Sequence, residues 1–108
     1  MDTLAEMKGF LQNIEQNDIH FKKHFYDNLN IKHRPINEGL VRATLKKTDN
    51  LLHFEQLISK FANEQKFKLW FKLSHKYRLV LIAITTGKDL NIVTGWNTNR
   101  KWQKDIQK

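Results

Sequence analysis

Apolar positions in the first part of the chain recur at intervals of three and four residues. The residues with this spacing are Leu4, Met7, Leu11 and Ile14. The spacing places them on one face of a helix. Thr3 and Glu6 have capping-box spacing, in which each side chain binds a backbone N–H of the first turn. The pattern therefore predicts an amphipathic helix over residues 3–16.

Two more helices are predicted before residue 48. Asp18 is expected to cap the first of them. Its apolar stripe would consist of Phe21, Phe25 and Leu29, with His20, His24 and Asp27 along an adjacent stripe. Pro35 breaks the chain. Asn37 then caps the next helix, with Ile36 and Val41 placed as a hydrophobic staple, and this helix ends near Lys47.

Residues 50–63 carry a pattern that fits a helix, although it leaves room for a strand. Leu51, Phe54, Ile58 and Phe61 recur at helical intervals, so a fourth helix is predicted. The alternation of Leu52 and Phe54 also fits a short strand, and this alternative stays open.

The remainder of the chain alternates with a period of two. Residues 67–73 place apolar side chains at odd positions and polar side chains or Trp70 at even ones, which predicts a strand with one covered face. Residues 79–84 are continuously apolar, as in a central strand. A turn at 86–89 leads to a third strand over residues 90–96.

These elements predict an α+β fold in one domain, with N-terminal helices packed on one face of a small three- to four-stranded antiparallel sheet. Its expected parts are an acidic N-terminal helix (1–17), a helical part (18–64), the antiparallel sheet (66–96) and a basic tail or short helix (97–108). The 108 residues leave no room for a second core. The uncovered sheet face should be basic and aromatic, because Lys68, Trp70 and Lys72 alternate with core residues.

Charge is distributed unevenly along the chain. The net charge is +8, but residues 1–20 hold one base and four acids, a local charge of −3, which leaves +11 on residues 21–108. The stretch 66–104 contains nine bases, one acid and all three Trp. Cationic side chains can bind phosphates, and aromatic rings between them can stack on unpaired bases. Nucleic acid is therefore the first partner to consider. The alternative is that the Lys-rich face serves only solubility.

Several kinds of chemistry lack the residues they need. The chain has no Cys, which removes disulfides and thiolate sites. The basic half offers only Asp89 and Asp105 as carboxylates, too few for a two-metal nuclease site. His20 and His24 lack a third ligand to complete a zinc set. No glycine-rich phosphate loop is present. We therefore expect neither a metal nor a cofactor, and no membrane span or signal peptide.

Metal-free cleavage of RNA requires only a few catalytic groups. The 2′-OH is the nucleophile, one group near neutral pKa removes its proton, another protonates the leaving 5′ oxygen, and cations stabilise the phosphorane. Five His residues and a basic, aromatic segment at Lys72, His75, Lys76, Tyr77 and Arg78 supply such groups. Any single His is more often structural than catalytic. A His becomes a catalytic candidate only if the fold places it close to other groups of this kind.

Four segments resemble the superfamily of small ribonucleases that includes barnase, EndoU, the colicin-type nucleases and RelE toxins. They are Ile19–His24 at a helix start, Arg34–Ile36 before the next helix, Tyr77–Ile82 as central strand and Ile92–Trp96 as late strand. The resemblance implies a toxin-type, metal-independent endoribonuclease of this α+β fold.

The same resemblance implies the site residues. His24 would be general base or acid, Arg78 would stabilise the phosphorane, and Thr94 would bind a nonbridging oxygen. His75, Tyr77 or Lys72 would carry the other proton. RNA-binding positions are expected at Lys23, Arg34, Lys68, Trp70, Lys72, Trp96 and Lys101.

Two rival functions follow from the same residues. One is a noncatalytic RNA-binding module that uses the sheet face, and the other is a protein-interaction domain that buries its exposed aromatic residues against a partner. For the ribonuclease, the expected partners are RNA and an acidic antitoxin protein, which would fit the +11 portion of the chain. A cytoplasmic location is expected.

Overall fold

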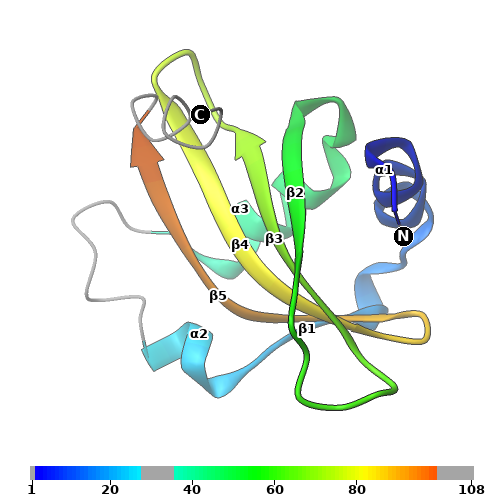
Figure 1. Cartoon of the computed structure of the whole chain (residues 1–108). Helices are drawn as coiled ribbons and strands as arrows, with labels where there is room; N and C mark the ends of the chain where they lie inside the picture. Colours follow the sequence, from blue (N-terminus) through cyan, green and yellow to red (C-terminus); the bar gives the residue numbers. More distant parts are fainter. Residues whose placement is uncertain (1, 28–35, 100–108) are drawn as a thin grey trace.

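Five strands form one mixed sheet in the order β1-β5-β4-β3-β2 (Figure 1). The computed structural model describes residues 2–27 and 36–99. Its strands are β1 (Ile19–Phe21), β2 (Leu51–Leu57), β3 (Gln65–Lys72), β4 (Tyr77–Thr86) and β5 (Asp89–Asn99). Its helices are α1 (Leu4–Asn13), α2 (Lys23–Asp27) and α3 (Glu38–Lys46), with 3₁₀ turns at Gln16–Asp18 and Thr48–Asn50.

The predicted α+β class is confirmed, but the sheet differs from the expected one. β2 to β5 form an antiparallel meander, whereas β1 pairs with β5 in parallel. The sheet therefore has five strands and a parallel pair, where three to four antiparallel strands were predicted. Figure 1 shows the long strands strongly twisted, with α3 behind the sheet and α1 beside β2.

The core lies between the sheet and the helices. Alternate residues of β3 and β4 face inward against α1 and α3. Its fully buried members include Met7 and Leu11 of α1, Val41 and Leu45 of α3, Phe67, Leu69 and Phe71 of β3, and Leu79, Leu81 and Ala83 of β4. One continuous apolar cluster thus joins the helices to the central strands.

The helix caps follow the sequence signals. In α1, Thr3 Oγ1 accepts from the Glu6 N–H at 3.1 Å, and Glu6 Oε1 accepts from the Thr3 N–H at 3.2 Å. The bond from the Thr3 side chain holds the pKa of Glu6 below its ordinary value. In α3, Asn37 Oδ1 accepts from the Leu40 N–H at 2.8 Å. The capping box and the Asn37 cap are confirmed.

Two basic side chains of α3 fasten the segment between α1 and β1. Arg42 donates to the Gln16 carbonyl at 2.9 Å and to the Ile19 carbonyl at 3.1 Å. Lys46 Nζ donates to the carbonyls of Leu11 and Ile14 at the end of α1. Cations there satisfy the last helix carbonyls and complement the helix dipole.

The predicted helix beginning at Asp18 is wrong. Asp18 ends a 3₁₀ turn, residues 19–21 form β1, and a short α2 follows. His20 and His24 therefore do not share one helix face, because His20 lies on β1 and His24 on α2. The reason is tertiary: β5 offers an edge with which Ile19 and Phe21 pair, in register with Leu90 and Ile92. Leu29 lies outside the described residues.

The predicted helix over residues 50–63 is also wrong, and the strand alternative holds for its first half. β2 pairs with β3 along residues 51–57, with Leu51 buried and Phe54 packed against the core. Pairing satisfies the edge of β3, which outweighs the helical spacing of a short apolar run. The expected helical part (18–64) thus includes two strands, and the sheet extends beyond the expected 66–96. None of the described helices is long and apolar enough to cross a membrane.

Candidate nucleic-acid interface

The strand register defines the sheet face that points away from the core. Residues that alternate with Phe67, Leu69 and Phe71 on β3, and their cross-strand neighbours, form what we call the outer face. It consists of His53, Glu55 and Leu57 of β2, Lys66, Lys68, Trp70 and Lys72 of β3, Arg78, Val80, Ile82 and Ile84 of β4, and Asn91, Thr94, Trp96 and Thr98 of β5. Within this set Glu55 is the one acid among four bases, so the face is positively charged as predicted.

An aromatic row crosses the middle of the outer face. His53 pairs with Trp70, Trp70 with Val80, and Val80 with Trp96. The His53 and Trp70 ring centroids are 4.9 Å apart. Lys68 Nζ lies 5.0 Å from the Trp70 ring and 5.5 Å from the Trp96 ring, so one ammonium has cation–π contact with both rings. His53 falls in the segment 50–63 that was predicted as a helix, and it instead belongs to this row of the sheet.

The expected exposure of Trp70 is wrong. The residue is on the outer face, as its phase in β3 requires, but only 3% of its surface is exposed. His53 and Lys68 are among the side chains that contact its ring, and period-two alternation does not report such contacts. Trp70 therefore supports its neighbours, while Trp96 is half-buried and His53 is exposed. An incoming base could contact Trp96 and His53 more readily than Trp70.

The β3–β4 hairpin gathers five of the polar side chains singled out in the sequence. We call Lys72, His75, Lys76, Tyr77 and Arg78 the hairpin cluster. The turn is held by Ser74, whose Oγ accepts from the Lys76 N–H at 3.3 Å and the Tyr77 N–H at 3.2 Å. Lys76 Nζ lies 5.8 Å from the Tyr77 ring centroid. Lys72, His75 and Lys76 are exposed, so an imidazole and two ammonium groups are accessible around one turn.

Arg78 anchors this turn. Only 8% of its surface is exposed, and its Nη1 donates to the Ser74 carbonyl at 3.0 Å and to the Tyr77 carbonyl at 3.1 Å. Bonds from a guanidinium to two carbonyls are charge-assisted and hold the turn in one shape. Arg78 thus has a structural task in the hairpin, in addition to any contact with a phosphate.

Thr94 and Arg78 both lie on the outer face, but at different positions along the strand direction. Arg78 pairs with Thr98, whereas Thr94 pairs with Ile82. Four residues of β5 separate the two levels, which is roughly 13 Å at the usual rise of a strand. A single phosphate cannot bridge that separation by itself, so contact with both residues would require an RNA segment longer than one nucleotide.

His24 lies on α2, and this helix packs against β5. The Lys22 N–H donates to the Ile92 carbonyl at 2.9 Å and starts this short helix at the strand edge. His24 and Lys23 are exposed. Tyr26 on the same helix donates its hydroxyl to Glu38 of α3, and this bond raises the pKa of Tyr26. α2 is thereby tied to both β5 and α3.

A second histidine, His20 of β1, lies beside the start of β5. His20 Nε2 is 3.5 Å from Asp89 Oδ1, and Lys88 Nζ is 3.8 Å from Asp18 Oδ1. These contacts link β1 and the preceding turn to the start of β5, so the His20 ring lies beside a carboxylate of the neighbouring strand.

Two expected RNA-binding residues, Arg34 and Lys101, lie outside the described residues. Within residues 2–27 and 36–99, no three His, Cys, Asp or Glu side chains lie close enough together to hold a metal ion. Compared with known proteins, the chain matches no family model, no curated protein and no solved structure.

Proposed function

We propose that this protein binds RNA on its outer face and cleaves it without a metal ion, with the hairpin cluster at the site of cleavage. The supporting observation is the composition of one hairpin, which carries His75, Tyr77, Lys72 and Lys76 next to the anchored Arg78. This turn lies at one end of the outer face. The bases of that face outside the hairpin cluster are Lys66 and Lys68. A polyanion following β3 along this face would reach the hairpin cluster.

The reaction needs two proton carriers and positive charge. A general base removes the proton of the 2′-OH, the oxygen attacks the adjacent phosphorus, and a general acid protonates the 5′ oxygen as its bond to phosphorus breaks. The products are a 2′,3′-cyclic phosphate and a free 5′-OH. We assign His75 as one carrier and His24 or Tyr77 as the other, with Lys72 and Arg78 stabilising the phosphorane.

Substitutions distinguish a site within the hairpin from one that spans two elements. Purified protein is incubated with total RNA in EDTA, and fragments are resolved on a gel. His75→Gln should reduce cleavage by about 10²-fold or more if His75 moves a proton. His24→Gln should have a comparable effect only if α2 contributes to the site. Cleavage that survives His24→Ala combined with Arg78→Ala would overturn the assignment.

A noncatalytic RNA-binding module is the second candidate, and the contact of Lys68 with Trp70 and Trp96 favours it. Such a module would bind single-stranded RNA with strong salt dependence and produce no fragments. Wild-type protein that binds RNA but leaves it intact, and that loses affinity in Lys72→Gln, would establish this function in place of the first.

The charge distribution also suggests a neutralising partner. We propose an acidic antitoxin protein that covers the outer face, because the basic residues of that face outnumber its single acid. The outer face would then be closed to RNA in the complex. A synthetic acidic peptide should compete with labelled RNA for the wild-type protein and lose that ability at high salt.

A further inference from the structure

The loop between β2 and β3 exposes two large apolar side chains. Ile58 is 97% exposed and Phe61 is 55% exposed. Lys60 Nζ lies 5.7 Å from the Phe61 ring centroid. Ser59 Oγ donates to Glu64 Oε2 at 3.1 Å, and the Glu64 N–H donates to the Phe61 carbonyl at 3.2 Å. We call residues 58–61 the apolar tip; these two bonds give the loop that carries it a defined shape.

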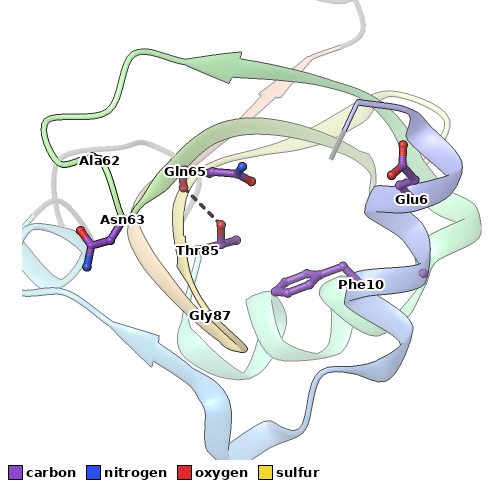
Figure 2. Close-up of a pocket in the computed structure, with 8 residues that line it drawn as sticks. Glu6, Phe10, Ala62, Asn63, Gln65, Thr85 and Gly87 are labelled. Atoms are coloured by element: carbon purple, nitrogen blue, oxygen red, sulfur yellow. Dashed lines mark hydrogen bonds between the residues drawn. The ribbon is translucent and has the colours of Figure 1, made fainter.

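A cleft of about 580 Å³ opens beside this loop (Figure 2). Figure 2 shows it between α1, the start of β3 and the β4–β5 turn. It is lined by Glu6, Gly9 and Phe10 of α1, Ala62, Asn63 and Gln65, and Thr85 and Gly87. A Cβ added at Gly9 would meet no heavy atom within 4 Å, so the helix side of the cleft is open to an incoming side chain.

The cleft and the apolar tip are chemically complementary. The Phe10 ring and Gly9 offer an apolar wall for Ile58 or Phe61. Glu6 is the acid of the cleft, and its bonds within the capping box all use Oε1, so Oε2 can meet a cation such as Lys60. The tip does not occupy the cleft of its own molecule: Ile58 is almost fully exposed, while Ala62 and Asn63 of the same loop form part of the cleft wall.

We propose that a second copy of this chain supplies the occupant, with the apolar tip of each protomer in the cleft of the other. The tip directly precedes Ala62 and Asn63, which line the cleft, so a two-fold axis beside this loop makes both contacts at once. Each contact inserts only two large apolar side chains, Ile58 and Phe61, whereas a stable interface buries roughly 800 Å² per partner. The dimer should therefore be weak and form with rising concentration.

Sedimentation equilibrium over a range of concentrations tests this proposal. The wild-type mass should rise from monomer to dimer, and Ile58→Ser should raise the dissociation constant about tenfold or more. Gly9→Gln fills the cleft with a good helix former and should have the same effect. Gly9→Ala, which leaves the cleft open, is the matched control and should dimerise as the wild type does.

Mixing the two defective variants tests reciprocity. Ile58→Ser retains a cleft and Gly9→Gln retains a tip, so one tip-in-cleft contact can form between them. The mixture should associate more strongly than either variant alone. A wild type that stays monomeric, or a dimer unaffected by Ile58→Ser and Gly9→Gln, would overturn the proposal. The proposal would also be overturned if the protein stayed monomeric and bound anionic vesicles through the apolar tip. RNA cleavage should be unchanged in both variants, since the hairpin cluster lies at the other end of β3.

Discussion

The guanidinium of Arg78 donates to the Ser74 carbonyl at 3.0 Å across the turn that joins β3 to β4. Because the same nitrogen also bonds the Tyr77 carbonyl, one buried charge fixes the backbone on which His75 and Tyr77 are carried. The shape of the proposed site therefore depends on a residue that was expected only to contact the phosphate.

Arg78→Lys should weaken both the fold and the activity. The ammonium keeps the charge, but the lysine side chain is shorter and does not place its nitrogen where Arg78 Nη1 bonds both carbonyls. Losing charge-assisted bonds costs about 1.5–3 kcal/mol. Urea denaturation should show that loss, and RNA cleavage should fall with it. Lys47→Gln, which changes an exposed lysine at the end of α3, is the control and should leave the stability unchanged. If Arg78→Lys is as stable as the wild type, the anchoring role is wrong.

Trp70 and Trp96 should respond differently to truncation. Trp70 is buried, so Trp70→Ala should destabilise the fold by about 3–5 kcal/mol. Trp96 is half-buried, so Trp96→Ala should cost less stability and weaken binding of a single-stranded RNA by about 1–3 kcal/mol if a base stacks there. Thermal denaturation and fluorescence anisotropy measure the two effects. Equal stability losses in both variants would refute this division.

Lys68 should contribute one phosphate contact. Each neutralised phosphate of single-stranded RNA adds about −0.7 to the slope of log K against log salt, so Lys68→Gln should reduce the slope by about that amount. Lys47→Gln changes an exposed lysine at the end of α3 and serves as the control. A slope unchanged by Lys68→Gln would place the RNA elsewhere.

The contact between Gly95 and Leu81 predicts a stability effect in the sheet. A Cβ on Gly95 would lie 2.7 Å from Leu81 Cδ2 and 3.2 Å from the Val80 carbonyl oxygen. Leu81 is fully buried and cannot move aside, so Gly95→Ala should destabilise the fold by about 1–3 kcal/mol. Gly9→Ala, which meets open space in α1, should instead stabilise it by up to about 1 kcal/mol. Denaturant midpoints that agree within error for the two variants would contradict this packing.

Local signals in the sequence located several elements correctly. The Thr3 and Glu6 capping box, the Asn37 cap and the alternation along β3 each depend on residues close in sequence, and each is present in the structure. β1 has only three residues, and β2 has a helical spacing, so both depend on pairing with distant strands. No short-range pattern reports such pairing.

In the candidate site, too, sequence patterns predicted the local features and missed the tertiary ones. Alternation placed Lys68, Trp70 and Lys72 on one face, and adjacency placed His75, Tyr77 and Arg78 at one turn. The burial of Trp70 and Arg78 depends on neighbours from other strands, and the offset between Thr94 and Arg78 depends on the β4–β5 register. These are tertiary properties that composition and periodicity do not encode.

The central claim is metal-independent cleavage of RNA, and mass spectrometry of the product ends tests it most directly. Wild-type protein is incubated with a defined single-stranded RNA in EDTA, next to His75→Gln. The account predicts fragments that end in a 2′,3′-cyclic phosphate with the wild type and few or none with the variant. Intact RNA, or cleavage that appears only when magnesium is added, would contradict it.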